Sequence, residues 1–301
     1  MQVILFSKDR PLQLHATLTS FARHCVESES LVINVVYRAT SEDFARGYQQ
    51  LREHQFGFAT LTWIEEKSFK DDLLRVLYAT TAKSSWPSFL RRYLLSRSIP
   101  LRSRHVLFLV DDTLFVRSFS LQRMVEALAH HPKALAFSLR LGRNTIRCYS
   151  RNRQQRLPEF RSEGADRLVF RWVGEEGDFG YPLEISSSLY RGADLIGLLT
   201  KLPYNNPNRL EQALSVCSKL FTRRMPELLC LNHSVAFCAP VNKVQSVINN
   251  RASDSQAYTS EALNVLFLKG VRIDVAQLDH FLPQAAHQEI ELPLFQPSAH
   301  P

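Results

Sequence analysis

The sequence VLFLVDDTLF, residues 106–115, carries five apolar residues directly into two adjacent carboxylates. The length and the Val, Leu and Phe content of residues 106–110 are typical of a strand buried in a parallel sheet. Asp111 and Asp112 would then lie at the carboxyl end of that strand, the edge where α/β proteins bind ligands. Two unpaired carboxylates this close to a core repel each other and lose their hydration. A divalent cation is the usual remedy, and oxygen ligands favour Mg²⁺ or Mn²⁺ with a phosphate-bearing substrate. The competing interpretation is a strand end followed by a helix-capping Asp.

Strands and helices alternate around this stretch through the first half of the chain. Expected strands cover residues 3–6, 31–37, 61–64, 106–110 and 134–139, and expected helices cover residues 11–24, 41–55, 71–82, 86–96 and 121–130. This alternation predicts an α/β fold with a mostly parallel central sheet and helices on both faces. A length of 301 residues fits one large α/β domain or two modest ones.

From Arg140 onward the chain is strongly basic and has little hydrophobic period. Loops and edge strands are expected over residues 140–171, a strand over 186–190, and helices over 193–202, 209–219 and 260–268. Residues 287–301 contain three prolines and no clear period, which predicts a flexible tail.

The net charge of +8 favours anionic partners such as nucleotides, phospholipid head groups or nucleic acid. No nucleic-acid-binding motif accompanies the Arg-rich segment, so nucleic acid is not expected. A solvated face, an acidic acceptor and peripheral contact with a membrane surface stay open for this segment. Five scattered cysteines without a CxxC pattern predict reduced thiols, no zinc site and a cytoplasmic protein. Neither a signal peptide nor an apolar run long enough to span a bilayer is visible, so contact with the inner face of the membrane would be peripheral.

The first expected strand leads into a second polar segment, Phe6-Ser7-Lys8-Asp9-Arg10-Pro11. Polar residues at the carboxyl end of a strand, followed by proline at a helix start, suit a nucleotide site. An ordinary polar loop is the alternative.

Together the two segments resemble the GT-A fold glycosyltransferases, in particular those of the family 2 type. VILFSKDRPLQL, at residues 3–14, is similar to the first strand and loop of that fold, and FLVDD, at residues 108–112, is similar to its DxD-type metal motif in an Asp-Asp variant. The resemblance covers residues 1–240. It implies a Rossmann-like single domain, with a nucleotide-sugar-binding half over residues 1–115 and an acceptor-binding and catalytic half over residues 116–286.

The resemblance implies a metal-dependent hexosyltransferase, expected to be inverting, that moves a sugar from a nucleotide-sugar donor to a hydroxyl of a glycan or lipid-linked acceptor. Asp112 would anchor Mg²⁺ or Mn²⁺, and His233 lies about where many such enzymes carry a late His that touches the metal or the diphosphate. An ordinary core or surface His is the alternative for His233. The residues implied for nucleotide-sugar binding are Phe6, Ser7, Lys8, Asp9, Arg10, Arg38, Lys70 and Asp111.

Sugar transfer also needs a carboxylate that removes the proton from the acceptor hydroxyl. Glu211 is the first candidate, because it falls where family 2 enzymes often have a Glu-Asp dipeptide, although the second acid is missing here. Asp178, in Gly177-Asp178-Phe179-Gly180, is the second candidate. Glu211 could instead be a first-turn acid that favours the helix dipole, and Asp178 a turn residue.

Two other functions compete with this prediction. A phosphatase of the haloacid dehalogenase type is disfavoured, because its two acids must lie two residues apart and here they are adjacent. A non-catalytic GT-A-like protein that binds a sugar or a partner stays open, because the second acid near Glu211 is missing.

Overall fold

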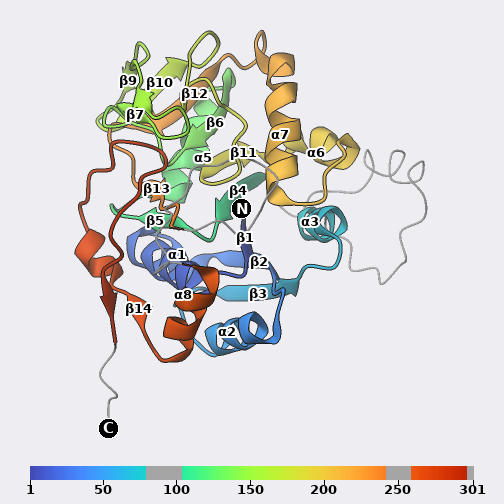
Figure 1. Cartoon of the computed structure of the whole chain (residues 1–301). Helices are drawn as coiled ribbons and strands as arrows, with labels where there is room; N and C mark the ends of the chain where they lie inside the picture. The colour runs from blue at the N-terminus through green and yellow to red at the C-terminus, as the bar shows by residue number, and fades with distance from the viewer. Residues whose placement is uncertain (79–103, 242–258, 297–301) are drawn as a thin grey trace.

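The computed structural model of the chain describes residues 1–78, 104–241 and 259–296. Figure 1 shows a central sheet with helices packed against it. In the described residues, one sheet has the strand order β3-β2-β1-β4-β11-β6-β12-β10-β9. Its strands are β1 (Gln2–Lys8), β2 (Val32–Arg38), β3 (Thr60–Glu65), β4 (His105–Val110), β6 (Ala134–Ser138), β9 (Arg161–Glu163), β10 (Arg167–Arg171), β11 (Ser188–Arg191) and β12 (Glu227–Leu231).

The sheet is parallel from β3 to β4 and mixed beyond it. Strand β11 runs antiparallel to both β4 and β6, so β6 points the same way as β4. Strand β12 is parallel to β6, while β10 and β9 are antiparallel additions. The predicted α/β class is confirmed, and most of the parallel pairs lie in the first half of the chain.

Alternate residues of the inner strands face two separate hydrophobic clusters. In β1, Val3 and Leu5 belong to one cluster and Ile4 and Phe6 to the other, and all are at most 3% exposed. Figure 1 shows the two matching groups of helices. The first cluster is covered by α1 (Pro11–His24), α2 (Glu42–Arg52), α5 (Leu121–His130) and α8 (Ser260–Leu268), and the second by α3 (Phe69–Leu77), α6 (Gly192–Lys201) and α7 (Pro207–Cys217). The burial of both faces explains the near-continuous apolar runs of the inner strands.

Shorter elements frame the ends of the sheet. The pairs are β5 (Thr113–Phe115) with β13 (Ala236–Cys238), β7 (Arg147–Cys148) with β8 (Arg153–Gln154), and β14 (Arg272–Ile273) with β15 (Leu294–Phe295). The 3₁₀ turns are η1 (Ser28–Ser30), η2 (Ser218–Phe221) and η4 (Val275–Leu278). Only two residues, Asp111 and Asp112, separate β4 from β5, so the two carboxylates lie in a tight connection between strands of two different sheets.

Several element boundaries differ from the sequence prediction for identifiable reasons. Helix α3 begins at Phe69, earlier than predicted, because the carboxylate of Asp72 accepts the backbone N–H groups of Lys67 and Ser68 at 2.8 and 2.9 Å. Strand β10 is an inner strand and not an edge, because its residues Leu168–Phe170 are buried between β12 and β9. The predicted helix over residues 86–96 lies outside the described residues.

The segment predicted as a tail from residue 287 is placed as far as residue 296. The backbone N–H of Gln288 donates to the carbonyl of Cys238 at 2.9 Å, and Leu292 is 5% exposed. Strand β15 pairs with β14 in the same segment. Within the described residues, no helix combines the length and the apolar character needed to cross a bilayer.

Candidate functional site

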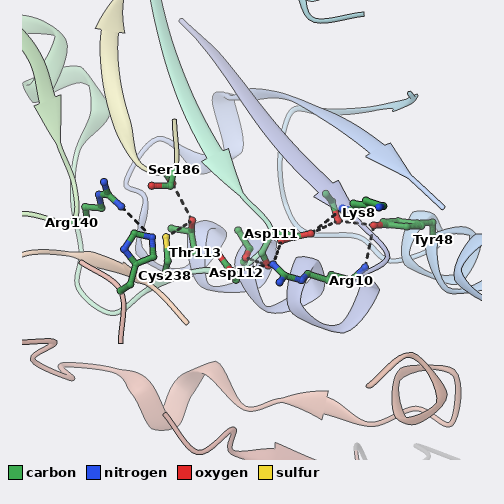
Figure 2. A network of polar contacts seen from close by, with 12 residues as sticks. Lys8, Arg10, Tyr48, Asp111, Asp112, Thr113, Arg140, Ser186 and Cys238 are labelled. Carbon is green, nitrogen blue, oxygen red and sulfur yellow. Dashed lines mark hydrogen bonds and ion pairs between the residues drawn. The ribbon is translucent and has the colours of Figure 1, made fainter. Parts of the chain in front are cut away.

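Strands β1 and β4 are neighbours and parallel, so their carboxyl ends meet at one edge of the sheet. Ser7 and Lys8 end β1, and Asp111 directly follows β4. One carboxylate oxygen of Asp111 accepts a hydrogen bond from the Ser7 hydroxyl at 2.9 Å and another from the Lys8 backbone N–H at 3.1 Å. Asp111 therefore ties the two strand ends together (Figure 2).

The guanidinium of Arg10 lies between the two carboxylates, which we call the aspartate pair. Its Nη1 atom is 3.1 Å from Asp111 Oδ1 and 3.1 Å from Asp112 Oδ2. The side chains of Arg10, Asp111 and Asp112 are 12%, 6% and 14% exposed, so little water reaches the contact. The acids are therefore not unpaired, as the sequence had suggested, because Arg10 reaches both from the loop after β1.

Burial raises the pKa of Asp111 and of Asp112 above the usual carboxyl range, and the Arg10 guanidinium opposes this rise at both. The proximity of Asp111 further raises the pKa of Asp112. The backbone around the pair is also fixed, since Thr17 donates from its hydroxyl to the Asp111 carbonyl and the Ala239 N–H donates to the Asp112 carbonyl, both at 2.8 Å. The pair is therefore a rigid, partly neutralised acidic site.

Asp9 shapes the loop that carries Arg10. Its backbone has φ of 55°, in the left-handed region that few non-glycine residues adopt. Its carboxylate accepts from the N–H and the hydroxyl of Thr40, each at 2.8 Å, and its own N–H donates to the Arg38 carbonyl at 3.1 Å. These bonds hold the strained turn that directs the chain from β1 into α1. A nucleotide-binding role for Asp9 stays a prediction.

A second charged group surrounds Arg140, which follows β6. Because β6 is parallel to β4, Arg140 lies at the same edge of the sheet as the aspartate pair. Arg140 is 3% exposed, its Nη2 atom is 3.8 Å from Glu184 Oε2, and its Nη1 atom is 3.5 Å from Nε2 of His287. Asp178 and Glu211 also interact electrostatically with its guanidinium. We call these five residues the Arg140 cluster.

The three carboxylates of the cluster are not equivalent. Glu184 accepts hydrogen bonds from the backbone or hydroxyl groups of Ser186, Ser187 and Ser188, including the Ser187 N–H at 3.0 Å. These bonds commit Glu184 to holding the segment before β11. Asp178 accepts from the amide of Gln155 at 3.0 Å. Asp178 and Glu211 lie in the same cluster, and their roles as catalytic bases stay predictions.

Burial raises the pKa of both Asp178 and Glu211, while Arg140 lowers each pKa. The neighbouring charge of Glu184 raises both further, and hydrogen bonds from the Tyr181 hydroxyl and the Ile185 backbone lower that of Glu211. Carboxyl groups with a raised pKa are suited to proton transfer near neutral pH. His287 remains neutral, because burial and the adjacent Arg140 lower its pKa to about 3.

Thr113 and Cys238 lie between the aspartate pair and the Arg140 cluster. The Thr113 hydroxyl donates to the Ser186 carbonyl at 3.0 Å and lies 3.7 Å from the Cys238 sulfur. Cys238 interacts electrostatically with both Asp112 and Arg140. Figure 2 shows the labelled side chains in a row from Arg140 through Thr113 to Asp112 and Arg10. The two charged groups therefore form one continuous polar site.

Phe6 and Arg38 lie away from this row of side chains. Phe6 is a core residue, with its ring 5.1 Å from that of Phe69 and 5.9 Å from that of Phe108. Arg38 is exposed at the end of β2, and its guanidinium is 3.5 Å from Glu66. It thus lies at the same sheet edge as Ser7 but on the next strand.

Lys70 and His233 are not brought to the aspartate pair by their described contacts. Lys70 donates to the Leu202 carbonyl at 2.6 Å and lies over the ring of Tyr204 at 5.1 Å. His233 is exposed on the turn after β12, with its ring 3.3 Å from the amide of Asn232. In the part of the chain that the structure describes, no three His, Cys, Asp or Glu side chains form a group that could hold a metal ion.

Sequence reasoning missed Arg140, Glu184 and His287 as site residues. Arg140 carried a usable signal, since it directly follows an apolar strand, but it was grouped with the Arg-rich segment, for which a solvated face, an acidic acceptor and a membrane surface stayed open. The sequence also carried a signal for Glu184, because an acid just before three consecutive serines can accept hydrogen bonds from their hydroxyl and backbone N–H groups. For His287 the sequence has no comparable signal, because its position depends on pairing between distant segments at Cys238.

The sequence is similar to that of a known sugar-transferring enzyme. No family model matches the sequence. The chain is 24% identical over 281 residues to the bifunctional glycosyltransferase pgtA of Dictyostelium discoideum. That alignment covers 84% of this chain and 33% of the relative, so the chain spans about a third of that protein.

Two solved structures are more distantly similar. S. aureus TarS 1-349 in complex with UDP-GlcNAc is 14% identical, with a TM-score of 0.42 over 92% of this chain and 69% of that one. Mannosyltransferase PcManGT from Pyrobaculum calidifontis, in complex with GDP-Man and Mn²⁺, is 13% identical, with a TM-score of 0.36 over 69% of this chain and 50% of that one. The similarity to pgtA confirms the predicted resemblance: over most of its length, this chain is similar to part of a glycosyltransferase.

Proposed function

We propose that the protein transfers a sugar from a nucleotide-sugar donor to a hydroxyl group of a glycan or lipid-linked acceptor. The observation that carries this proposal is that the aspartate pair and the Arg140 cluster lie at the same edge of the sheet. The aspartate pair lies beside the end of β1, and two carboxyl groups with a raised pKa lie in the Arg140 cluster. A leaving diphosphate and an acceptor proton are the two charges that sugar transfer must manage, and each group suits one of them.

The donor would bind at the aspartate pair and the loop after β1. Ser7, Lys8 and Arg10 supply donors there, and Arg38 lies on the neighbouring strand for the nucleotide. Two carboxylates suit Mg²⁺ or Mn²⁺, because such ions take one or two protein carboxylates and complete their coordination with phosphates and water. Asp112 would hold the ion, which would neutralise charge on the leaving diphosphate as a Lewis acid, while Asp111 would contact the ribose or the outer shell of the metal. His233 stays a prediction as a further ligand.

The acceptor hydroxyl would lose its proton to Glu211, with Asp178 as the second candidate. Both lie next to Arg140, which favours their ionised, proton-accepting form. Tyr181 and the Ile185 backbone further orient Glu211 through hydrogen bonds. We propose an inverting transfer, which needs one such base. A hexose is the sugar class that we propose.

The Arg-rich segment belongs to the acceptor side of the proposal. Arg151 and Arg153 share Glu176, and Arg161 pairs with Glu227, so part of its charge is balanced within the chain. The remaining exposed arginines would favour an anionic acceptor or peripheral contact with the inner face of a membrane, in keeping with a cytoplasmic location.

A thermal shift experiment tests the donor half of this proposal. The protein is heated with UDP, GDP, CDP or dTDP, each with and without Mn²⁺. We expect one nucleotide to raise Tm by several degrees only when Mn²⁺ is present, because a ligand that binds the folded state stabilises it by mass action. The Asp112→Asn variant should lose this effect, whereas Asp43→Asn, at an exposed helix position, should keep it.

The outcomes separate the competing functions. Failure of all four nucleotides to stabilise the protein in Mn²⁺ contradicts the proposed donor. Stabilisation without donor hydrolysis or transfer would support the non-catalytic sugar-binding alternative. Turnover of an aryl phosphate would support the phosphatase, which the adjacent spacing of Asp111 and Asp112 disfavours.

A further inference from the structure

The aspartate pair already has a cation supplied by the chain. A single nitrogen of Arg10, Nη1, lies 3.1 Å from an oxygen of each carboxylate, and the guanidinium is 12% exposed. At this separation in a site with little water, charge attraction is much stronger than at an open surface. Any divalent ion that binds Asp112 must therefore displace or repel a cation that is in place.

The two carboxylates depend on Arg10 to different extents. Asp111 also accepts from the Ser7 hydroxyl and the Lys8 N–H, so it keeps two donors when the guanidinium moves. Within the described part of the chain, the carboxylate of Asp112 accepts hydrogen bonds from Arg10 and from its own backbone N–H, and from no other side chain. Loss of the contact between Arg10 and Asp112 therefore disturbs fewer hydrogen bonds than loss of the contact between Arg10 and Asp111.

The backbone of Arg10 is fixed while its side chain is long. Its N–H donates to the Tyr48 hydroxyl at 3.3 Å, Asp9 precedes it in a tied left-handed turn, and Pro11 begins α1 immediately after it. A change of partner at Asp112 would thus need a rotation of the Arg10 side chain and no movement of the strand end. Guanidinium groups bind phosphate oxygens in a planar, two-bonded geometry, so a diphosphate is a competent new partner.

We propose that Arg10 competes with the divalent cation for Asp112, and that the donor diphosphate relieves this competition by accepting the guanidinium. The inference rests on the proposed function, because it takes the diphosphate as the ligand. Its consequence is that metal and nucleotide bind interdependently. By linkage, the factor by which nucleotide tightens metal binding equals the factor by which metal tightens nucleotide binding.

Binding of Mn²⁺ alone, followed by electron paramagnetic resonance of the free ion, tests the competition without any turnover. We compare the wild type with Arg10→Met, which keeps the volume of the side chain and removes its charge. We expect the variant to bind Mn²⁺ about tenfold more tightly than the wild type in the absence of nucleotide. Adding the nucleoside diphosphate found by thermal shift should tighten Mn²⁺ binding in the wild type and much less in the variant.

Matched variants make the result interpretable. Arg75→Met removes an arginine from a different Arg–Asp contact, with Asp72, and should leave Mn²⁺ affinity unchanged. Arg10→Met combined with Asp112→Asn restores the local charge balance, so it should fold even if the single variant does not, and it should lose the gain in Mn²⁺ affinity. Measurement of the wild-type coupling in both directions, metal on nucleotide and nucleotide on metal, needs no variant.

The results distinguish failure of this inference from failure of the proposed function. If nucleotide and Mn²⁺ bind the wild type independently, or if Arg10→Met binds Mn²⁺ no more tightly, Arg10 does not compete and the inference is overturned. If Arg10→Met gains Mn²⁺ affinity but no nucleoside diphosphate binds either protein, the competition stands and the proposed donor does not.

Discussion

Asp111 and Asp112 are neighbours in the sequence with different surroundings in the structure. Asp111 is 6% exposed and accepts from three donors on the β1 side, whereas Asp112 is 14% exposed and shares Arg10 with it. Asp111 therefore holds the ends of β1 and β4 together, whereas the charge of Asp112 is stabilised by fewer hydrogen bonds. This difference assigns the structural role to the first acid and the exchangeable, ligand-facing role to the second.

The difference predicts unequal effects of the two amide variants on stability. Asp111→Asn should lower the free energy of unfolding by about 2 kcal/mol, the usual contribution of hydrogen bonds to a charged group. Asp112→Asn should change it by less than about 1 kcal/mol, because it removes repulsion from Asp111 as well as attraction to Arg10. Chemical denaturation measures both. A larger loss for Asp112→Asn than for Asp111→Asn would contradict this division of roles.

At the scale of elements, β6 decides where the second half of the site lies. It points the same way as β4 because β11 is inserted between them, antiparallel to each. The residue after β6, Arg140, therefore reaches the edge occupied by the aspartate pair. Helix α7 brings Glu211 and the segment before β11 brings Glu184 to the same guanidinium.

This arrangement predicts how the activity depends on pH. The pKa of Glu211 is raised by burial, so a base at this position ionises above the ordinary carboxyl range and activity should fall as pH drops through that raised value. Arg140 opposes the rise, so Arg140→Met should move the acidic limb of kcat/KM for donor hydrolysis to higher pH. Arg140→Lys keeps the charge and should restore most of the wild-type profile.

The contrast between the two Arg140 variants is the informative result. An unchanged acidic limb in Arg140→Met would show that neither Glu211 nor Asp178 ionises in the working step. The variants Glu211→Gln and Asp178→Asn then identify the base. The variant that lacks the true base should have a kcat about 10²- to 10⁴-fold lower than the wild type, while it still binds nucleotide.

Local patterns predicted much of the first half of the fold. Apolar runs and caps identified β1, β2, β4, α1 and α2, because the pattern that predicts each of these elements lies within its own residues. The strand at β11 was expected, but its place between β4 and β6 was not, since that depends on antiparallel pairing across distant segments. Because the carboxyl ends of parallel strands meet at one edge of the sheet, the sequence also predicted that Ser7 and Asp111 lie close together. The contact of Arg10 with both acids depends on the conformation of its side chain, which the spacing of residues in the sequence does not determine.

At the scale of the whole molecule, buried histidines link stability to pH. His15 of α1 is 6% exposed, with its ring 4.7 Å from that of His54 and 6.0 Å from that of Phe267 in α8. Burial, together with the nearby His54 and Arg272, lowers the pKa of His15 from 6.5 to about 3. The unfolded chain therefore binds one proton more than the folded chain between these values.

It follows that the contribution of His15 to stability is lost as pH falls below about 6.5, by up to about 1.4 kcal/mol per pH unit. His15→Leu should flatten this part of the stability profile by that amount, whatever it does to stability at neutral pH. His130→Leu changes an exposed histidine and should leave the slope as in the wild type. Urea denaturation at a series of pH values between 7 and 5 measures the slopes, and equal slopes for all three proteins would refute a neutral His15.

The insertion of β11 has a consequence for how the protein is made. Strand β4 ends at Val110, and the strand that covers its second edge begins only at Ser188. On a ribosome the chain emerges from its N-terminus, so β4 can pair with β1 long before its other neighbour exists. Until then a strongly apolar strand presents open backbone groups, the kind of edge that recruits other nascent chains and chaperones. The yield of this protein in a cell should therefore depend on how fast residues 111–187 are translated, as well as on the stability of the finished sheet.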